Sequence, residues 1–269
     1  MTFERVSTAA VVLRNLLIGS NAVAVARALR APRKAVGYVQ DCLFAHENMF
    51  GRERFVPAHV TAELGNGSPV SITLASARTA GAKHWFGLSA SYLADLVSLC
   101  EICRIVEPKV VFEIGTLKGF TAYHFALNTG PDATVYSLDL PPGVPETLLR
   151  TTVVDDWHIQ RRRPTGALCF EGTPEAKKIR CLYGDSAAFD YESYHDRVDL
   201  FFIDGAHSYE YVKSDTEHAW RCCRSGGVIV WHDAGRVGVN GVTQYLQEAA
   251  RTYRICLVPG ASLAYAVKP

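Results

Sequence analysis

The sequence lacks an excess of charge of either sign, because 28 lysines and arginines stand against 27 aspartates and glutamates. A balanced charge gives no reason to expect a nucleic acid as a partner. Long apolar runs are also missing. The longest uncharged stretch near the start, residues 15–26, is well short of the ~20 residues that a helix needs to cross a bilayer. The N-terminus has no signal-peptide pattern, so we expect a cytoplasmic protein without a membrane span.

Cysteine pairs at zinc-site spacing are missing as well. The chain has eight cysteines, but Cys100 and Cys103 lie in an apolar, helix-like stretch and no second pair follows at a suitable distance. Buried free thiols in a reducing compartment are therefore expected. The apolar share of 48% and the charged share of 20% are typical of a globular protein. They exclude collagen-like, coiled-coil and disordered classes.

A length of 269 residues suggests one large domain, or one domain with an appendage. Residues 1–88 show helical apolar spacing in their first half. A Gly65-Asn66-Gly67 turn then stands between two short strand-like runs. We expect a mainly helical extension that caps the substrate side or forms a dimer contact. Its basic residues are either a solvated helix face or a contact for an anion; they are Arg27, Arg30, Arg33 and Lys34.

Residues 89–269 alternate short β-branched runs with helical segments, which predicts a doubly wound α/β fold with a parallel sheet. Helices are expected at 89–107, 120–130, 208–223 and 241–250. The expected strands are 109–115, 134–140, 178–185, 198–204, 227–233, 253–259 and 262–268. Residues 141–178 are the one long connection without a regular pattern, and they include Arg161–Arg163. Such connections are often lids, so we interpret this one as a lid insertion.

Acidic residues follow or end the first five strands of this pattern. Open parallel sheets bind their ligands outside the carboxyl ends of the strands, so these residues are expected at one edge. An acidic side chain at all five strand ends is hard to explain as a set of unrelated turns or caps. The residues are Glu113, Asp139, Asp185, Asp204 and Asp233.

The segments VVFEIGTLKGFT, YSLDL, GDS, FFIDGAHSYE and GGVIVWHD, over residues 109–235, resemble class I S-adenosylmethionine (SAM)-dependent methyltransferases. The bacterial sugar and natural-product O-methyltransferases, with I-D-G after the fourth strand, are the most similar subgroup. The resemblance implies a Rossmann-like sheet of seven strands with an antiparallel last pair. It also implies methyl transfer from SAM to a hydroxyl of a sugar, glycoside or phenolic compound. The loop reads G-T-L-K-G, so the dinucleotide pattern G-x-G-x-x-G is absent, which argues against a nicotinamide enzyme.

The resemblance also implies a set of cofactor-binding residues. Glu113 is placed to accept from the ammonium of SAM, the N-terminus of the following helix to receive its carboxylate, and Asp139 to bind the ribose. Asp185 and Ser186 match the position that holds the adenine amino group. The full implied set is Glu113, Gly115, Thr116, Gly119, Thr121, Asp139, Gly184, Asp185, Ser186 and Asp204.

Asp204 and Asp233 match the positions of metal ligands in the family, which implies a Mg²⁺ that lowers the pKa of the acceptor hydroxyl. The sequence departs from the family pattern at two places. Ala206 stands where relatives often have a second carboxylate, and His232 precedes Asp233, so His232 becomes a candidate metal ligand. His207 is then the candidate general base, with Asp204 as the second catalytic residue.

Two other functions stay open from the sequence alone. Asp204, His207, His232 and Asp233 can bind iron in a hydroxylase of the same fold, if both imidazoles point at one centre. A SAM-binding subunit without catalysis is the other alternative. The expected partner is a small-molecule acceptor, with no nucleic acid, and a homo-oligomer is expected.

Overall fold

The structure is a computed structural model that describes residues 56–57, 60–75, 90–141, 149, 168–236 and 239–269. The helices expected before residue 51, the basic residues among them, and Arg161–Arg163 lie outside the described residues. No helix in the described ranges is long and apolar enough to cross a membrane. The seven cysteines in these ranges are all free, and Cys100 and Cys103 are buried, as predicted.

The fold is built on a single mixed sheet with the order β1-β7-β8-β6-β5-β2-β3-β4. Strand β8 runs antiparallel to β6 and β7, and every other neighbouring pair is parallel. The strands are β1 (Val56–Pro57), β2 (Val110–Ile114), β3 (Thr134–Asp139), β4 (Ile179–Tyr183), β5 (Val198–Ile203), β6 (Cys223–Trp231), β7 (Cys256–Leu257) and β8 (Ala264–Val267). The seven predicted strands and the antiparallel last pair are confirmed. Strand β1, from the N-terminal extension, adds an eighth at the edge.

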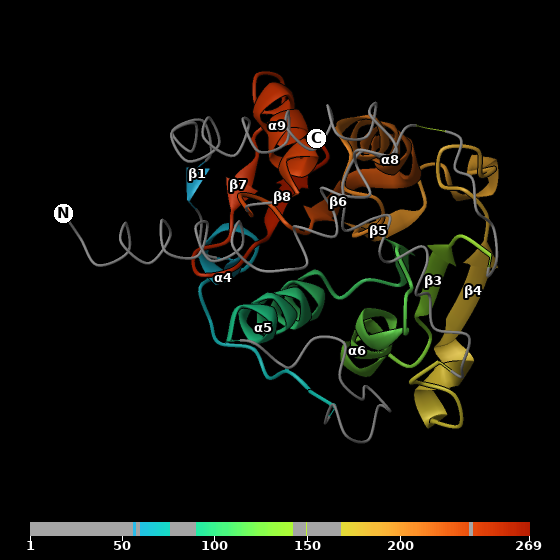
Figure 1. Cartoon of the computed structure of the whole chain (residues 1–269). Helices are drawn as coiled ribbons and strands as arrows, with labels where there is room; N and C mark the ends of the chain where they lie inside the picture. The colour runs from blue at the N-terminus through green and yellow to red at the C-terminus, as the bar shows by residue number, and fades with distance from the viewer. Residues whose placement is uncertain (1–55, 58–59, 76–89, 142–148, 150–167, 237–238) are drawn as a thin grey trace, which may run out of the picture.

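Helices cover both faces of the sheet (Figure 1). They are α4 (Val60–Glu63), α5 (Ala90–Val106), α6 (Phe120–Asn128), α8 (Tyr209–Cys222) and α9 (Asn240–Ala249), with 3₁₀ turns η2 (Pro174–Lys178) and η3 (Glu192–Tyr194). Helices α5 and α6 pack on one face, and α8 and α9 on the other. Every residue of β5 is buried, as its continuous apolar sequence predicts. Strand β6 begins at Cys223, directly after α8 and four residues before the predicted start.

The chain adds strands on one side of β2 as far as β4 and then returns to add β5 on the other side, so the strand order reverses at β2. The strand ends that carry the site meet at this point. Strand β2 pairs with β3 on one side and with β5 on the other. Gly115 follows β2 with φ 105°, and a Cβ at this position would lie 2.0 Å from the carbonyl oxygen of Asp204. Glycine is therefore required here by the contact between the two strand ends themselves.

The described part of the N-terminal extension packs against α5 and α6. The predicted turn at residues 65–67 is present, since Gly67 has φ 78° and the Asn66 side chain accepts from the Ser68 backbone. The strand-like runs beside it are wrong: residues 60–63 form α4, and residues 68–75 form no strand. The prediction failed because a short V-T-A-E segment fits a helical turn as well as a strand. As part of this turn, Val60 is buried against α5.

Of the predicted lid insertion, residues 141, 149 and 168–178 lie among the described residues. Residues 168–178 pack against the body of the domain: the Cys169 amide donates to Lys118, and Phe170 is buried. The Phe170 ring occupies the space into which a Cβ at Gly119 would project. The Phe170 side chain is therefore part of the core, whereas the rest of the segment is half-buried or exposed. Residues 142–148 and 150–167 lie outside the described residues.

Candidate functional site

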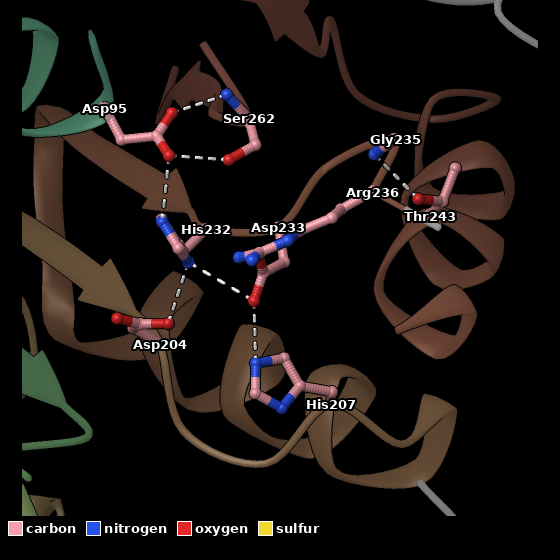
Figure 2. Close-up of polar contacts among 9 residues, drawn as sticks. All are labelled: Asp95, Asp204, His207, His232, Asp233, Gly235, Arg236, Thr243 and Ser262. Atoms are coloured by element: carbon pink, nitrogen blue, oxygen red, sulfur yellow. Dashed lines mark hydrogen bonds and ion pairs between the residues drawn. The ribbon is translucent and has the colours of Figure 1, made fainter. Parts of the chain in front are cut away.

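The carboxyl ends of β5 and β6 bring together Asp204, His207, His232 and Asp233 (Figure 2). Asp204 and His207 follow β5, and His232 and Asp233 follow β6, the neighbouring strand in the sheet. The parallel pairing of these strands places their carboxyl ends side by side. The sequence-based expectation that these four side chains share one edge of the sheet therefore agrees with their observed positions.

His232 lies between three carboxylates. Its Nδ1 atom is 3.1 Å from Oδ1 of Asp204 and 3.3 Å from Oδ2 of Asp233, and its Nε2 atom is 3.3 Å from Oδ2 of Asp95. Burial lowers the pKa of His232, but the charges of Asp204 and Asp233 outweigh burial and raise this pKa well above its ordinary value. A positive charge at this point is thus strongly favoured, whether it is a proton or a metal ion.

Asp233 connects the two histidines. Its Oδ2 atom lies 2.8 Å from Nε2 of His207, and its Oδ1 atom accepts from Nη1 of Arg236 at 2.7 Å. Burial raises the pKa of Asp233, but His232 and His207 more than offset this effect and hold the pKa well below its usual range. Asp233 also has φ 59°, a strained conformation for a residue with a side chain. A strained backbone conformation of this kind persists only where the surrounding contacts hold the residue in place.

Helix α9 packs closely against the backbone of His207. Gly241, in the first turn of α9, approaches the carbonyl of His207 so closely that a Cβ would lie 2.4 Å from that oxygen. His207, His232 and Asp204 also line one small pocket, whose apolar wall includes Val212 and Val242. The side chain of His207 is only 11% exposed. Its backbone and its ring are therefore both fixed in place.

The donor atoms of Asp204, His232 and Asp233 fit a divalent cation. One ligand atom from each lies within 4.8 Å of the others. The two N–O separations at Nδ1 of His232, 3.1 and 3.3 Å, match the spacing of neighbouring donors around an ion with bonds of about 2.1 Å. That Nδ1 atom is buried, and no hydrogen bond of good geometry satisfies it. A buried nitrogen close to two carboxylates, yet badly aligned for hydrogen bonding, suits coordination.

Glu113 lies at one end of a series of hydrogen bonds that leads to Thr116 in the loop after β2. Its Oε2 atom accepts from the Ser137 hydroxyl, which is in turn 2.7 Å from the Thr116 hydroxyl. The other oxygen, Oε1, is buried without a hydrogen bond. Burial raises the pKa of Glu113 to about 8. The predicted contact to the SAM ammonium would use the oxygen that has no hydrogen-bond partner.

The loop before α6 can hold an anion at its helix N-terminus. Gly119 is the N-cap of α6, with φ 75°, and as a glycine it provides no side-chain hydrogen bond to the first turn of the helix. Thr121 lies in the first turn of this helix. Asp139 accepts from the Leu117 and Leu140 backbones and so holds the loop at the end of β3. These features fit the carboxylate and ribose of SAM.

The predicted adenine-binding turn follows β4. The Gly184 amide donates to the Asp139 carbonyl, which places this turn beside the end of β3. Asp185 accepts from the Ala187 backbone at 2.9 Å and from the Tyr211 hydroxyl at 2.7 Å, and the Ser186 side chain is nearly buried. Asp139, Gly184, Asp185 and Ser186 are therefore neighbours, at some distance along the sheet from His232.

Sequence reasoning missed Asp95, Tyr211, Arg236 and Ser262 as site residues. Asp95 lies in an apolar helix more than 100 residues before the histidine it contacts, so no local motif connects them. Tyr211 has the spacing of a core residue, and its aromatic ring is indeed buried. The one signal in the sequence was Asp95 itself, an acidic residue in an otherwise apolar helix. A buried charge without a partner is costly, so such a residue indicates a partner elsewhere in the fold.

Residues 112–234 match a family model described as a methyltransferase domain. The chain contains a methyltransferase domain. The predicted resemblance to class I SAM-dependent methyltransferases is thereby confirmed over these residues. The matched segment includes Glu113, Asp204, His232 and Asp233, whereas Asp95 and Ser262 lie outside it. No curated protein sequence matches the chain.

Solved structures of other methyltransferases resemble this one distantly. The O-methyltransferase TomG from Streptomyces achromogenes, involved in tomaymycin synthesis and solved in complex with SAM, is 16% identical with a TM-score of 0.46; the match covers 74% of this chain and 93% of TomG. The SAH-bound methyltransferase PaMTH1 from Podospora anserina is 13% identical with a TM-score of 0.47, covering 75% of this chain and 100% of that one. These similarities are too distant to transfer an activity.

The arrangement in the methyltransferase domain disfavours the iron-binding alternative. Among the described residues, the group able to hold a metal consists of Asp204, His232 and Asp233 and does not include His207. His207 instead faces an oxygen of Asp233. The two imidazoles therefore meet at a carboxylate, whereas a two-histidine iron site needs both at one open centre.

Proposed function

We propose that the protein is a SAM-dependent O-methyltransferase in which His207, held by Asp233, takes the proton of the acceptor hydroxyl. The observation that carries this proposal is the 2.8 Å contact between Nε2 of His207 and Oδ2 of Asp233 at the strand ends. Asp233 has a strongly lowered pKa and is ionised at neutral pH, so it accepts a hydrogen bond from Nε2–H. The negative charge of Asp233 then stabilises the imidazolium that forms when His207 takes the proton of the acceptor.

The bound cofactor supplies an electrophilic methyl group. Asp139 orients the ribose, and the N-terminus of α6 holds the carboxylate. Asp185 and Ser186 hold the adenine. The close contact between Gly115 and Asp204 keeps the loop that binds the cofactor adjacent to the strand end that carries the acidic residues. The residues that bind SAM and those that handle the acceptor are thus supplied by neighbouring strands.

We propose that Asp204, Asp233 and His232 hold a divalent cation, for which the family resemblance suggests Mg²⁺. A cation at this position lowers the pKa of an acceptor hydroxyl and positions its oxygen. The side chain of Asp204 is 28% exposed, so this carboxylate is partly accessible to an acceptor. The acceptor is a small molecule with a sugar, glycoside or phenolic hydroxyl, as the resemblance suggests.

The proposal is tested with isotope-labelled SAM and a panel of sugar and phenol acceptors, with and without EDTA. Transfer of label to a hydroxyl is the expected result, and its loss in EDTA with recovery on adding a divalent cation supports the cation. Absence of transfer to every acceptor, together with absence of SAH binding in calorimetry, would overturn the function. Transfer that persists in EDTA would overturn the cation alone.

Variants separate the roles of the residues. His207→Gln is expected to lower kcat by about 10²–10⁴ while leaving the Kd for SAH unchanged, because it removes a proton acceptor and no cofactor contact. His195→Gln, at an exposed position near the opposite strand ends, is the matched control. Asp139→Ala is expected to weaken SAH binding. Asp204→Ala and Asp233→Ala are both expected to abolish turnover, and Asp233→Ala, which lies outside the implied cofactor-binding set, is expected to spare SAH binding.

A further inference from the structure

Asp95 is buried behind His232, on the side away from Asp204 and Asp233 (Figure 2). Its Oδ2 atom lies 3.3 Å from Nε2 of His232, and the Asp95 side chain is only 4% exposed. The same oxygen accepts from the Ser262 hydroxyl at 2.7 Å, and Oδ1 accepts from the Ser262 backbone N–H at 2.5 Å. The carboxylate therefore has a fixed orientation before it meets the histidine.

Ser262 also holds the end of β6. Its carbonyl oxygen accepts from the Ala234 amide at 3.0 Å, one residue after the strained Asp233. On the other side of this segment, the Gly235 amide donates to the Thr243 hydroxyl at 2.8 Å. Asp95 on α5, the β7–β8 connection and the His232–Asp233 segment are thus joined into one rigid unit.

We propose that Asp95 is a positioning residue that accepts a hydrogen bond from Nε2–H of His232 and so directs the Nδ1 lone pair of that ring at a cation shared with Asp204 and Asp233. This inference rests on the cation site of the proposed function. A carboxylate on the far nitrogen of a ligating histidine fixes the ring tautomer and orientation. No other ionisable group is recorded at Nε2 of His232 in the described part of the chain.

A nitrogen ligand changes which cation the site prefers. Mg²⁺ is held through oxygen atoms, whereas imidazole suits first-row transition ions. His232 therefore makes the site bind an ion such as Co²⁺ more tightly than Mg²⁺, the ion that the family resemblance suggests. Asp95 supports this choice, because without it the imidazole can rotate or carry its proton on Nδ1.

The test is a Co²⁺ titration of the metal-stripped full chain without SAM, monitored by visible absorption. A competition titration with Mg²⁺ then compares the two affinities. Asp95→Asn is expected to weaken Co²⁺ binding about 10–100-fold and to change the absorption spectrum. Ser262→Ala keeps the carboxylate and one of its hydrogen bonds, so a smaller weakening is expected. Asp204→Asn is expected to abolish the signal, which shows that the ion is at this site.

Asp199→Asn is the matched control. Asp199, near the start of β5 and far from the site along the strand, is a largely buried aspartate that accepts from the Lys109 and Val110 backbones and pairs with Arg224. It is expected to leave Co²⁺ affinity unchanged. Equal weakening by Asp199→Asn and Asp95→Asn would overturn the inference, because the effect would then be general destabilisation.

The remaining outcomes are also decisive. Wild-type affinity and spectrum in Asp95→Asn would overturn the role of Asp95 while leaving the proposed function intact. Tighter binding of Mg²⁺ than of Co²⁺ would overturn the nitrogen ligand. Absence of Co²⁺ binding in the wild type would overturn both this inference and the cation of the proposed function, and labelled methyl transfer in EDTA would show that the methyltransferase activity itself stands.

Discussion

The hydroxyl of Tyr211 donates to Oδ2 of Asp185 at 2.7 Å and accepts from the backbone N–H of Leu149 at 3.2 Å. One buried hydroxyl on α8 thus joins the proposed adenine-binding turn to the segment between β3 and β4. This contact gives Tyr211 a polar task in addition to its packing in the core. It also explains why an aromatic residue with a hydroxyl, and not phenylalanine, suits the position.

Tyr211→Phe is expected to raise the Kd for SAH by about tenfold, because a hydrogen bond to a charged carboxylate contributes about 1.5–3 kcal/mol. Isothermal calorimetry measures this change. Tyr209→Phe is the control, since the Tyr209 hydroxyl donates to the exposed Glu248 at a similar distance. An unchanged Kd in Tyr211→Phe would contradict the role of this hydroxyl at the adenine site.

Gly115→Ala is expected to destabilise the fold by more than 2 kcal/mol, because the added methyl group would meet the Asp204 carbonyl at 2.0 Å. Gly67→Ala separates this clash from backbone strain. Gly67 also has positive φ, but a Cβ there has no neighbour within 4 Å, so a cost of about 1 kcal/mol is expected. Urea unfolding measures both values, and similar losses in the two variants would argue against the close contact.

Glu113→Gln is expected to flatten the pH dependence of stability. The pKa of Glu113 is about 8 in the folded protein, against an ordinary value near 4.5, so the folded state keeps a proton that the unfolded chain releases. The free energy of unfolding from this group is therefore largest below about pH 4.5 and falls by up to ~1.4 kcal/mol per pH unit as the pH rises toward 8.

Urea unfolding of both proteins at pH 5 and pH 8 tests this expectation. The difference in stability between wild type and Glu113→Gln should change by a few kcal/mol between these conditions. Asp215, whose pKa burial raises to about 7, titrates in both proteins and cancels from the difference. Glu192→Gln, in an exposed 3₁₀ turn, should behave as the wild type. A parallel pH profile in Glu113→Gln would refute the raised pKa.

Asn128→Ala is expected to lower the free energy of unfolding by roughly 1–3 kcal/mol, because it leaves buried polar groups without partners. The Asn128 side chain donates to the Thr73 carbonyl and accepts from the Thr73 amide, both at 2.8 Å, and so attaches the N-terminal extension to α6. Asn66→Ala removes only one contact in an exposed turn. Equal stability of the two variants in urea would contradict this attachment.

Much of the fold follows from local pattern. The apolar runs of β2 and β5 are buried on both faces of the sheet, and a continuous apolar run of this kind can be recognised within a short stretch of sequence. Helix α5 ends at Val106, just before Pro108, as proline rules predict. Strand β1 was not predictable, because two residues at a sheet edge have no periodic signal and depend on the neighbouring β7 for their pairing.

The sequence by itself determined that acidic residues and two histidines follow consecutive strands, since chain order and strand polarity place them at one edge. It could not determine which histidine faces which carboxylate. That depends on Asp95, Ser262 and Gly241, which come from segments far apart in the chain and act only through packing. A pattern along the chain records local periodicity, whereas the charge around His232 is set by three carboxylates that only the folded sheet and helices bring within 3.3 Å of one ring.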